Sequence, residues 1–453
     1  MRDTIVSIMG SGDTGMVVYL DSPSAHEDAL EYRPLSLDAS KMPALDTSAN
    51  VTAYGAAVRA ALFGHPAIEH ELTEIFGLPA PERLALRFLI RTPDAERLRW
   101  ETIHSGAPDT RFLAISDLCT VSRLAPTKIE SALRVFTYPL RMIAFLSAAG
   151  IKAAAEMQKI CERIVAIKAE GLQLECTIFV GEQALLDDYQ KRIATGDMQH
   201  AGITVKQIPA TATEIANLLR DSPAQFVHFF CHGVERLGVQ GLSLATINDH
   251  DVNEATGADT SSIFLSVTAL SEAVKLNSSI WVAVLNSCSG GMPIRQLFSM
   301  ALDVAKKGCP YTVGMAEPID TDAATRFSEA FYGELFRIVK SRLRAGVTGA
   351  VEMDLAPAVI PARKIIHDHC NATPNNFGRW LLPLLYEAAE QPLVVLSLPP
   401  ELAERILDVA KSLRQMNPDT PLVVRDQILA LLDKPPPVPA EFRPNRYGEF
   451  KYD

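Results

Sequence analysis

The sequence predicts an α/β protein with a mostly parallel central sheet and helices on both faces. Apolar runs of strand length alternate with segments of helical apolar spacing from about residue 174 onward, which is typical of this class. The middle runs, such as residues 281–285, are apolar without alternation, as strands buried on both faces are. The composition, 48% hydrophobic and 21% charged, is that of an ordinary globular protein.

Each predicted element rests on its local pattern. The β-rich runs 4–9 and 16–20 flank a glycine-rich turn and predict a hairpin, followed by a polar loop over 21–50. Apolar residues then recur at helical spacing over 52–76. By the same criteria, strands are expected at 84–90, 140–146, 174–180, 203–208, 226–230, 281–285, 311–315 and 392–398, helices at 153–170, 184–194, 213–221, 266–275, 297–306 and 323–341, and two short amphipathic helices within 401–433.

Charge and cysteine usage exclude several classes of protein. The 453 residues carry a net charge of −11, which argues against broad nucleic-acid binding because that needs a dense basic face. The seven cysteines are odd in number and form no C-x-x-C pair, which indicates a reducing compartment. No signal peptide or apolar run of membrane-spanning length is visible. We therefore expect a cytoplasmic protein that binds neither nucleic acid nor membranes directly.

Reactive side chains follow two of the predicted buried strands. The strand 226–230 continues into Cys231, His232 and Gly233, and the strand 281–285 continues through Asn286 and Ser287 into Cys288. Ligands bind at the carboxyl ends of strands in open α/β sheets, so two neighbouring strands would bring His232 and Cys288 together.

A cysteine beside a histidine is suited to nucleophilic catalysis. The thiolate is the reactive form, and an imidazole can take the thiol proton and then protonate the leaving group. We predict Cys288 as the nucleophile and His232 as its acid/base partner. The backbone N–H groups of Gly233 and Cys288 are the expected oxyanion donors. Two glycines after the nucleophile, at 290 and 291, would open the backbone there.

Two neighbouring residues compete with this assignment. His228 lies four residues before His232, so it faces the same side of a regular strand and is expected to line or support the site. Cys231 points to the opposite face and is expected in the core. For Cys288 and His232 themselves, the alternatives are a buried small hydrophobe and a structural histidine.

The two motifs resemble the CHAT domain, a caspase- and separase-related peptidase module of bacteria. The order strand-Cys-His-Gly, then strand-Asn-Ser-Cys-Ser-Gly-Gly, carries the resemblance, and residues 308–315 and the helix after Asp320 are similar to the family's next elements. Upstream, the residues at 98–101 resemble its Pro-Trp-Glu element, with Arg99 in place of proline. The similarity covers about residues 80–395.

The resemblance implies a caspase-like α/β sandwich in two halves. It gives three regions: 1–165, an N-terminal hairpin and a pseudo-caspase half; 166–400, the catalytic half; and 401–453, C-terminal helices and a proline-rich tail. It also implies that a backbone carbonyl orients the imidazole, so that no third catalytic carboxylate is needed. Relatives act in defence or cell-death systems, often after an upstream sensor protein activates them.

An acidic pocket residue would select a basic side chain before the scissile bond in such a family. Asp320 is the best candidate, although a helix cap ahead of residue 323 explains it equally well. The other acidic candidates are Asp249, Asp251, Glu317 and Asp322. The residues at 237–262 form a long polar segment between the motifs and are a candidate lid or substrate-binding loop.

Two further motifs are interpreted as structural. Residues 10–15 fit G-x-G-x-x-G but precede a β-like run, so they predict a hairpin turn and no dinucleotide site. The His-Asp-His-Cys run at 367–370 has no partner cluster with metal-ligand spacing, and we expect neither a metal nor a cofactor.

The sequence therefore predicts a cysteine endopeptidase that cleaves a specific partner protein, in a bacterial antiviral defence or cell-death pathway and under the control of an activating partner. A caspase-like scaffold that binds a partner without catalysis is the main alternative. A small-molecule acyl transferase using the same pair of residues is a third.

Overall fold

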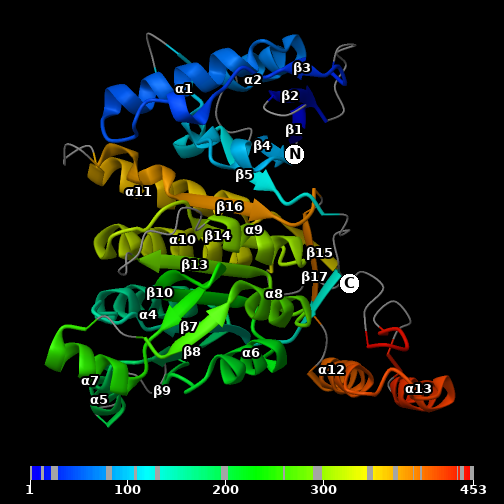
Figure 1. Ribbon diagram of the computed structural model, residues 1–453. Coiled ribbons are helices and arrows are strands. Elements are labelled where there is room, and N and C mark those ends of the chain that lie inside the picture. The colour runs from blue at the N-terminus through cyan, green and yellow to red at the C-terminus, as the bar shows by residue number, and fades with distance from the viewer. Residues whose placement is uncertain are drawn as a thin grey trace.

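The computed structural model describes residues 3–11, 15–21, 29–77, 84–106, 110–127, 133–194, 202–258, 261–288, 298–343, 350–370, 376–390, 392–397, 400–435, 437–438 and 443–448. Its centre is a 14-stranded sheet. Most of its strands follow the order β3-β2-β1-β4-β5-β16-β14-β13-β10-β7-β8-β9, and the remaining two are β11, which pairs with β10, and β12, which pairs with β11. A second sheet has three strands in the order β15-β17-β6. Figure 1 shows the large sheet running from the N-terminal hairpin at the top to β9 at the bottom.

The strands are β1 (Asp3–Ser11), β2 (Gly15–Leu20), β3 (Arg33–Pro34), β4 (Leu84–Ile90), β5 (Cys119–Leu124), β6 (Leu133–Phe136), β7 (Leu140–Leu146), β8 (Leu174–Val180), β9 (Ile203–Gln207), β10 (Phe226–Arg236), β11 (Val239–Leu244), β12 (Ile263–Ser266), β13 (Val282–Cys288), β14 (Tyr311–Met315), β15 (Ala350–Met353), β16 (Pro383–Glu387) and β17 (Leu393–Ser397).

The α-helices are α1 (Ser48–Leu62), α2 (Pro66–Gly77), α3 (Pro93–Glu96), α4 (Ala154–Ala169), α5 (Gln183–Ala194), α6 (Ala212–Asp221), α7 (Ile247–Thr256), α8 (Val267–Lys275), α9 (Phe298–Lys306), α10 (Thr321–Arg342), α11 (Val359–Cys370), α12 (Pro400–Arg414) and α13 (Leu422–Leu429). The short 3-10 helices are η1 (Ala39–Lys41), η2 (Trp100–Thr102), η3 (Leu113–Ile115), η4 (Ala356–Ala358), η5 (Phe377–Leu381) and η6 (Ala430–Asp433).

The predicted α/β class is confirmed. Along the part of the sheet with the order β14-β13-β10-β7-β8-β9, every neighbouring pair of strands is parallel. On the other side of β14, β16 runs antiparallel to it. The strand register places helices on both faces of this sheet. Asn286 bonds to the Ala324 carbonyl of α10 on one face, whereas Gly314, paired with the adjacent Leu285, packs on Ala301 of α9 on the other.

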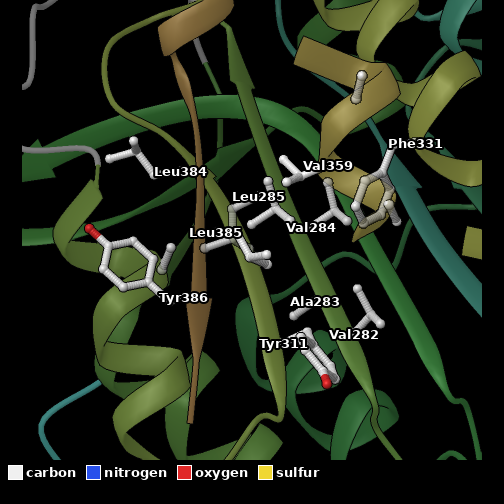
Figure 2. Close-up of a cluster of buried hydrophobic side chains, with 14 of the residues drawn as sticks. Val282, Ala283, Val284, Leu285, Tyr311, Phe331, Val359, Leu384, Leu385 and Tyr386 are labelled. Atoms are coloured by element: carbon white, nitrogen blue, oxygen red, sulfur yellow. The ribbon is translucent and has the colours of Figure 1, made fainter. Parts of the chain in front are cut away.

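The largest core cluster has residues on both faces of the large sheet. Figure 2 shows side chains of β13 packed beside β14, with Phe331 from α10 and Val359 from α11 among them. Val284 and Leu285 are almost wholly buried. This explains why the apolar runs predicted the central strands: each such strand is covered on both sides.

Several elements differ from their predictions for local reasons. The predicted helix at 52–76 is two helices, and the second begins at Pro66, a residue that is well tolerated at the first position of a helix. The hairpin at 4–20 is confirmed, and Gly10 and Gly15 both lie in its paired strands, which leaves no phosphate-binding helix after them. The segment at 237–262 contains β11 and α7.

The proposed boundary at residue 165 cuts across the large sheet. β7 comes from the first region, yet it pairs with β10 and β8 of the second. The three-region division therefore stays a proposal. None of the helices in the described part of the chain is both long and apolar enough to cross a membrane.

Candidate active site

The two predicted motifs meet on adjacent strands where β13 ends, whereas β10 continues past His232 to Arg236. β10 and β13 are parallel neighbours, and the last pair in their register is His232 opposite Cys288. Neighbouring strands lie about 4.8 Å apart, so the Cα atoms of the two residues are separated by about one strand spacing. The predicted pair is thus brought together by the backbone alone. For Cys288 the structure describes the backbone, and residues 289–291 lie outside the described residues.

The imidazole of His232 is held by a backbone carbonyl. Its Nε2 lies 2.7 Å from the carbonyl oxygen of Ala149, just beyond the end of β7, and the side chain is 3% exposed. Because a carbonyl only accepts hydrogen bonds, Nε2 must carry the proton. In the neutral ring Nδ1 is then the basic nitrogen, which is the form that a general base requires.

A buried polar network lies behind the pair, on the face covered by α4 and α10. Glu156 of α4 accepts hydrogen bonds from Ser328 of α10 and, at 3.3 Å, from Asn286 of β13. His228 of β10 places Nε2 3.1 Å from Glu156 Oε1 and Nδ1 2.8 Å from the Tyr332 hydroxyl. All five side chains are almost completely buried.

This network ties both motif strands to the two helices. His228 lies four residues before His232, and Asn286 lies two residues before Cys288. Burial, followed by the negative charge of Glu156, raises the pKa of Tyr332 well above its usual value, so the phenol stays protonated. The prediction that His228 would support the site agrees with this arrangement, since the network fixes the strands that carry the pair.

Cys231 is separate from the site chemistry. Its side chain is fully buried, and burial raises the pKa of its thiol, so it stays protonated. The other described cysteine side chains, those of Cys119, Cys161, Cys176, Cys309 and Cys370, are also buried free thiols. Buried protonated thiols are poor nucleophiles.

Asp320 has the structural role that the sequence left open. It is the N-cap of α10, where Oδ1 accepts from the Ala323 N–H at 2.9 Å, and its Oδ2 forms an ion pair with Arg379. Both carboxylate oxygens therefore already have strong partners. A basic side chain of a substrate would have to displace Arg379 to reach it.

The other acidic candidates are also accounted for. Hydrogen bonds from Ser262 and Thr246 lower the pKa of Asp249 although burial alone would raise it, and this carboxylate completes the capping box of α7. Glu317 is paired with Arg99 at 2.8 Å. Asp251 is exposed, and Asp322 contacts Arg326 at 2.9 Å.

A large cleft opens beside the loop that follows β14, the neighbour of β13. Ile319 donates its N–H to the Ser287 carbonyl at 3.3 Å, so the loop after β14 runs next to the residue that precedes Cys288. Just before it, Glu317 and Pro318 line a cleft of about 770 Å³. Its other walls include Tyr54 and Arg99 of the N-terminal region and Arg379 of η5.

The charges in this cleft nearly balance. Arg99, which is 6% exposed, bonds to Glu317, and Arg379 bonds to Asp320. The N-terminal region thus contributes a wall to a cleft beside the loop that follows β14, although sequence reasoning assigned no residue of that region to the site. A stretch at 39–46 lines the same cleft.

The described part of the chain holds no cluster suited to a metal ion. Among the described residues, no group of three or more His, Cys, Asp and Glu side chains is placed to hold an ion. In the run at 367–370, His367 contacts Asp368 at 3.1 Å and His369 contacts Asp322 at 3.1 Å, and both lie in the last turn of α11. These surface contacts fit the helix-end interpretation of the sequence.

Sequence reasoning missed the residues that hold the pair in place. Ala149 acts through its backbone, so no side-chain pattern could identify it. Glu156 did leave a signal: it lies four residues before Ile160 and eight before Ile164, on the apolar face of α4. A carboxylate on such a face indicates a buried polar partner.

Residues 145–350 match the family model of the CHAT domain. The resemblance found in the sequence is thereby confirmed over this range, which holds both motifs and is shorter than the range of about 80–395 that the sequence indicated. The match supports a caspase-like protease family for this part of the chain.

One solved structure similar to this chain is the Saccharomyces cerevisiae separase–securin complex, with a TM-score of 0.35 and 14% sequence identity. The similarity covers 74% of this chain and 17% of that chain. No curated protein matches the sequence.

Proposed function

We propose that the protein is a cysteine endopeptidase that cleaves a specific partner protein through Cys288 and His232. The observation that carries this proposal is the strand register, which sets the two residues opposite each other at the carboxyl end of β13. Residues opposite each other on neighbouring strands project from the same face of a sheet. The register therefore supports a thiol–imidazole pair.

The proposed reaction proceeds in two halves. His232 Nδ1 takes the Cys288 thiol proton, and the thiolate sulfur attacks the scissile carbonyl carbon to form a tetrahedral oxyanion. The oxyanion collapses, the C–N bond breaks, and the imidazolium protonates the leaving amine. Water, deprotonated by His232, then attacks the thioester and releases the acid and the free thiol.

The surrounding residues have supporting roles in this proposal. The Ala149 carbonyl keeps the proton on Nε2 and stabilises the imidazolium, so a third catalytic carboxylate is not required. The backbone N–H groups of Gly233 and Cys288 are the proposed oxyanion donors. The cleft lined by Arg99 and Glu317 is the proposed entry for the polypeptide.

The biological setting is a proposal that rests on the family resemblance alone. We propose that the protein acts in the cytoplasm in a bacterial defence or cell-death pathway, after activation by a partner. A non-catalytic scaffold remains the alternative, and it is favoured if the protein cleaves no partner and Cys288 is no more reactive than an ordinary thiol.

Cleavage of candidate partner proteins tests the proposal. Products of neighbouring genes are incubated with the wild-type protein, with Cys288→Ala and with Cys309→Ala, and fragments are followed by gel electrophoresis. We expect Cys288→Ala to lower the cleavage rate by about 10³-fold or more, since the nucleophile is lost. Cys309→Ala removes a buried free thiol and is the matched control.

The opposite result has a clear reading. Equal cleavage by wild type and Cys288→Ala would contradict the proposed nucleophile. If neither variant cleaves, labelling with an electrophile decides: Cys288 reacting no faster than an ordinary exposed thiol would favour the scaffold.

A further inference from the structure

Helix α7 lies in the segment between the two motifs. It contacts the residues just after β7, whose Ala149 carbonyl binds the His232 ring. The helix is fixed at its start by a capping box between Thr246 and Asp249, and the Asp249 carboxylate also accepts from Ser262 at 2.6 Å. These contacts close the segment onto itself. One side of the helix buries His250, while its other side, including Asp251 and Val252, is exposed.

His250 contacts the first residue after β7. Its Nε2 lies 3.3 Å from the Ser147 hydroxyl, which also donates a hydrogen bond to the Ala245 carbonyl. A hydroxyl has one proton to give, so Ser147 must accept from His250. Burial lowers the pKa of His250, which keeps its ring neutral with the proton on Nε2.

The atoms around the contact between Ser147 and His250 are tightly packed. A Cβ on Gly181, at the end of β8, would lie 2.2 Å from the Ala245 carbonyl oxygen and 2.3 Å from the Ser147 hydroxyl. It would also lie 3.0 Å from the His250 ring. Since such distances are far below van der Waals contact, only glycine fits there, and Ser147 and His250 are held closely together.

The segment that follows Ser147 supplies the carbonyl for His232. The Ser147 N–H donates to the Phe230 carbonyl of β10 at 2.9 Å, which aligns this segment with the strand that carries His232. Two residues later, the Ala149 carbonyl accepts from His232 Nε2 at 2.7 Å. On the surface, Lys152 and Glu254 form a further ion pair between the segment and α7.

We propose that α7 is a positioning element for His232, with His250 and Ser147 as positioning residues that hold the Ala149 carbonyl in place. Neither side chain touches the reacting atoms. They act through the main chain of residues 147–149, which fixes the tautomer and the orientation of the imidazole. The catalytic consequence rests on the proposed function, whereas the effect on the His232 ring does not.

The ring nitrogens of His232 provide the direct test. The full chain is labelled with ¹⁵N-histidine in a Cys288→Ala background, which removes catalysis, and long-range ¹H–¹⁵N spectra are recorded at pH 8. The His232 signals are assigned by their loss in His232→Gln. We expect the Nε2–H tautomer in this background, and a mixture of the two neutral tautomers after His250→Ala.

Three further variants make the result specific. His250→Gln places an amide N–H where Nε2 lay and should restore the single tautomer. Ser147→Ala, a smaller change, should reproduce the mixture if His250→Ala does not fold. His65→Ala removes another fully buried histidine, bonded to the Glu31 carbonyl in the N-terminal region, and should leave the His232 signals unchanged.

The proposal is overturned if His232 keeps the pure Nε2–H tautomer in folded His250→Ala and Ser147→Ala. In the active background, we expect His250→Ala to lower kcat by about 10- to 100-fold with little change in KM, as for a small misplacement of a catalytic group. A wild-type protein that does not cleave would count against the proposed function only, because the tautomer result still decides the positioning role.

Discussion

Buried charged side chains in this protein form small clusters of opposite charge. Arg87 of β4 bonds to Asp3 at 2.7 Å and to Glu387 at 3.1 Å, and Ser122 also donates to Glu387. Asp354 lies beside this group. Burial first, and then the negative charge of Glu387, raises its pKa to about 6. Three carboxyl groups thus share one guanidinium, which leaves Asp354 poorly compensated when ionised.

Replacement of Asp354 should therefore change how stability depends on pH. Because its folded pKa lies above the usual value of 3.8, the folded protein binds more protons between about pH 4 and 6. The free energy of unfolding must then fall as the pH rises through this window. We expect Asp354→Asn to be about 1–3 kcal/mol more stable than wild type at pH 8, and not at pH 4.

Urea denaturation of both proteins at several pH values measures this difference. The Asn side chain still offers an oxygen to the Ala356 N–H, which Asp354 now binds at 3.0 Å, so the local turn should survive. A stability difference that is the same at pH 4 and pH 8 would show that Asp354 does not titrate in this window.

The candidate residues divide by how they could be recognised. The proposed pair, His232 and Cys288, could be named from the sequence because an apolar run leads into a reactive side chain in each motif. Asp320 was predictable only as two alternatives, because a capping aspartate and a pocket aspartate have the same local sequence. Ala149 and the partners of His250 depend on the folded path of the main chain, for which the sequence holds no side-chain signal.

Among the elements, two of the strands that sequence reasoning missed, β5 and β16, bury polar side chains. β5 has Thr120, Ser122 and Arg123 buried on a strand in the middle of the sheet, so its sequence lacks an apolar run. β16 begins with a proline and carries Glu387. Both were invisible to hydrophobic patterns because their polar groups find partners only in the folded protein.

Arg123 joins β5 to the segment that resembles the Pro-Trp-Glu element. Its guanidinium binds Glu101 through two hydrogen bonds of 3.1 Å, binds Glu96 at 2.9 Å, and donates to the Leu98 carbonyl. The arginine is fully buried. Trp100 in the same segment stacks on Phe88 of β4, with ring centroids 5.1 Å apart. This ion-pair group and this aromatic contact are among the interactions that fix the segment.

Removal of this guanidinium should be costly. We expect Arg123→Met to lower the free energy of unfolding by about 3–5 kcal/mol, since two carboxylates would stay buried without their cation. Arg123→Lys should recover only part of this loss, because an ammonium group cannot bind Glu101 through two parallel N–H groups.

Denaturant unfolding in a background that lacks both carboxylates tests whether unpaired charge causes the loss of stability. If unpaired charge is responsible, Arg123→Met should cost much less in a chain that also carries Glu96→Gln and Glu101→Gln. An equal cost in both backgrounds would assign the loss to packing of the arginine side chain and not to its charge.

At the scale of the whole molecule, the C-terminal segment has a small core of its own, apart from the large one. The large core includes residues from Val6 to Val395, whereas Ile406, Val409, Leu413, Leu432 and Val438 form their own cluster in the C-terminal helices. Figure 1 shows α12 and α13 beside the main body at the lower right. A cleft of about 500 Å³ separates α12 from the segments at 220–223 and 276–279.

This division predicts two levels of stability. A cluster of five buried residues removes little apolar surface from water, so we expect the C-terminal helices to open at lower free energy than the central sheet. Hydrogen exchange in increasing, sub-denaturing urea should expose amides of α12 and α13 while those of β10 and β13 remain protected. Arg414 donates to the Leu276 carbonyl at 2.5 Å and is one of the links to the main body. Arg414→Ala should therefore lower the opening free energy of the C-terminal helices further below that of the sheet.

A chain that ends after residue 397 provides the complementary measurement. β17, the last strand of the small sheet, is retained, and each strand of the large sheet precedes the cut. If the C-terminal helices are a separate unit, the shortened protein should fold, and its sheet amides should exchange as in the full chain. Protection lost throughout β10 and β13 would instead show that the helices and the sheet unfold as one unit, despite the cleft beside α12.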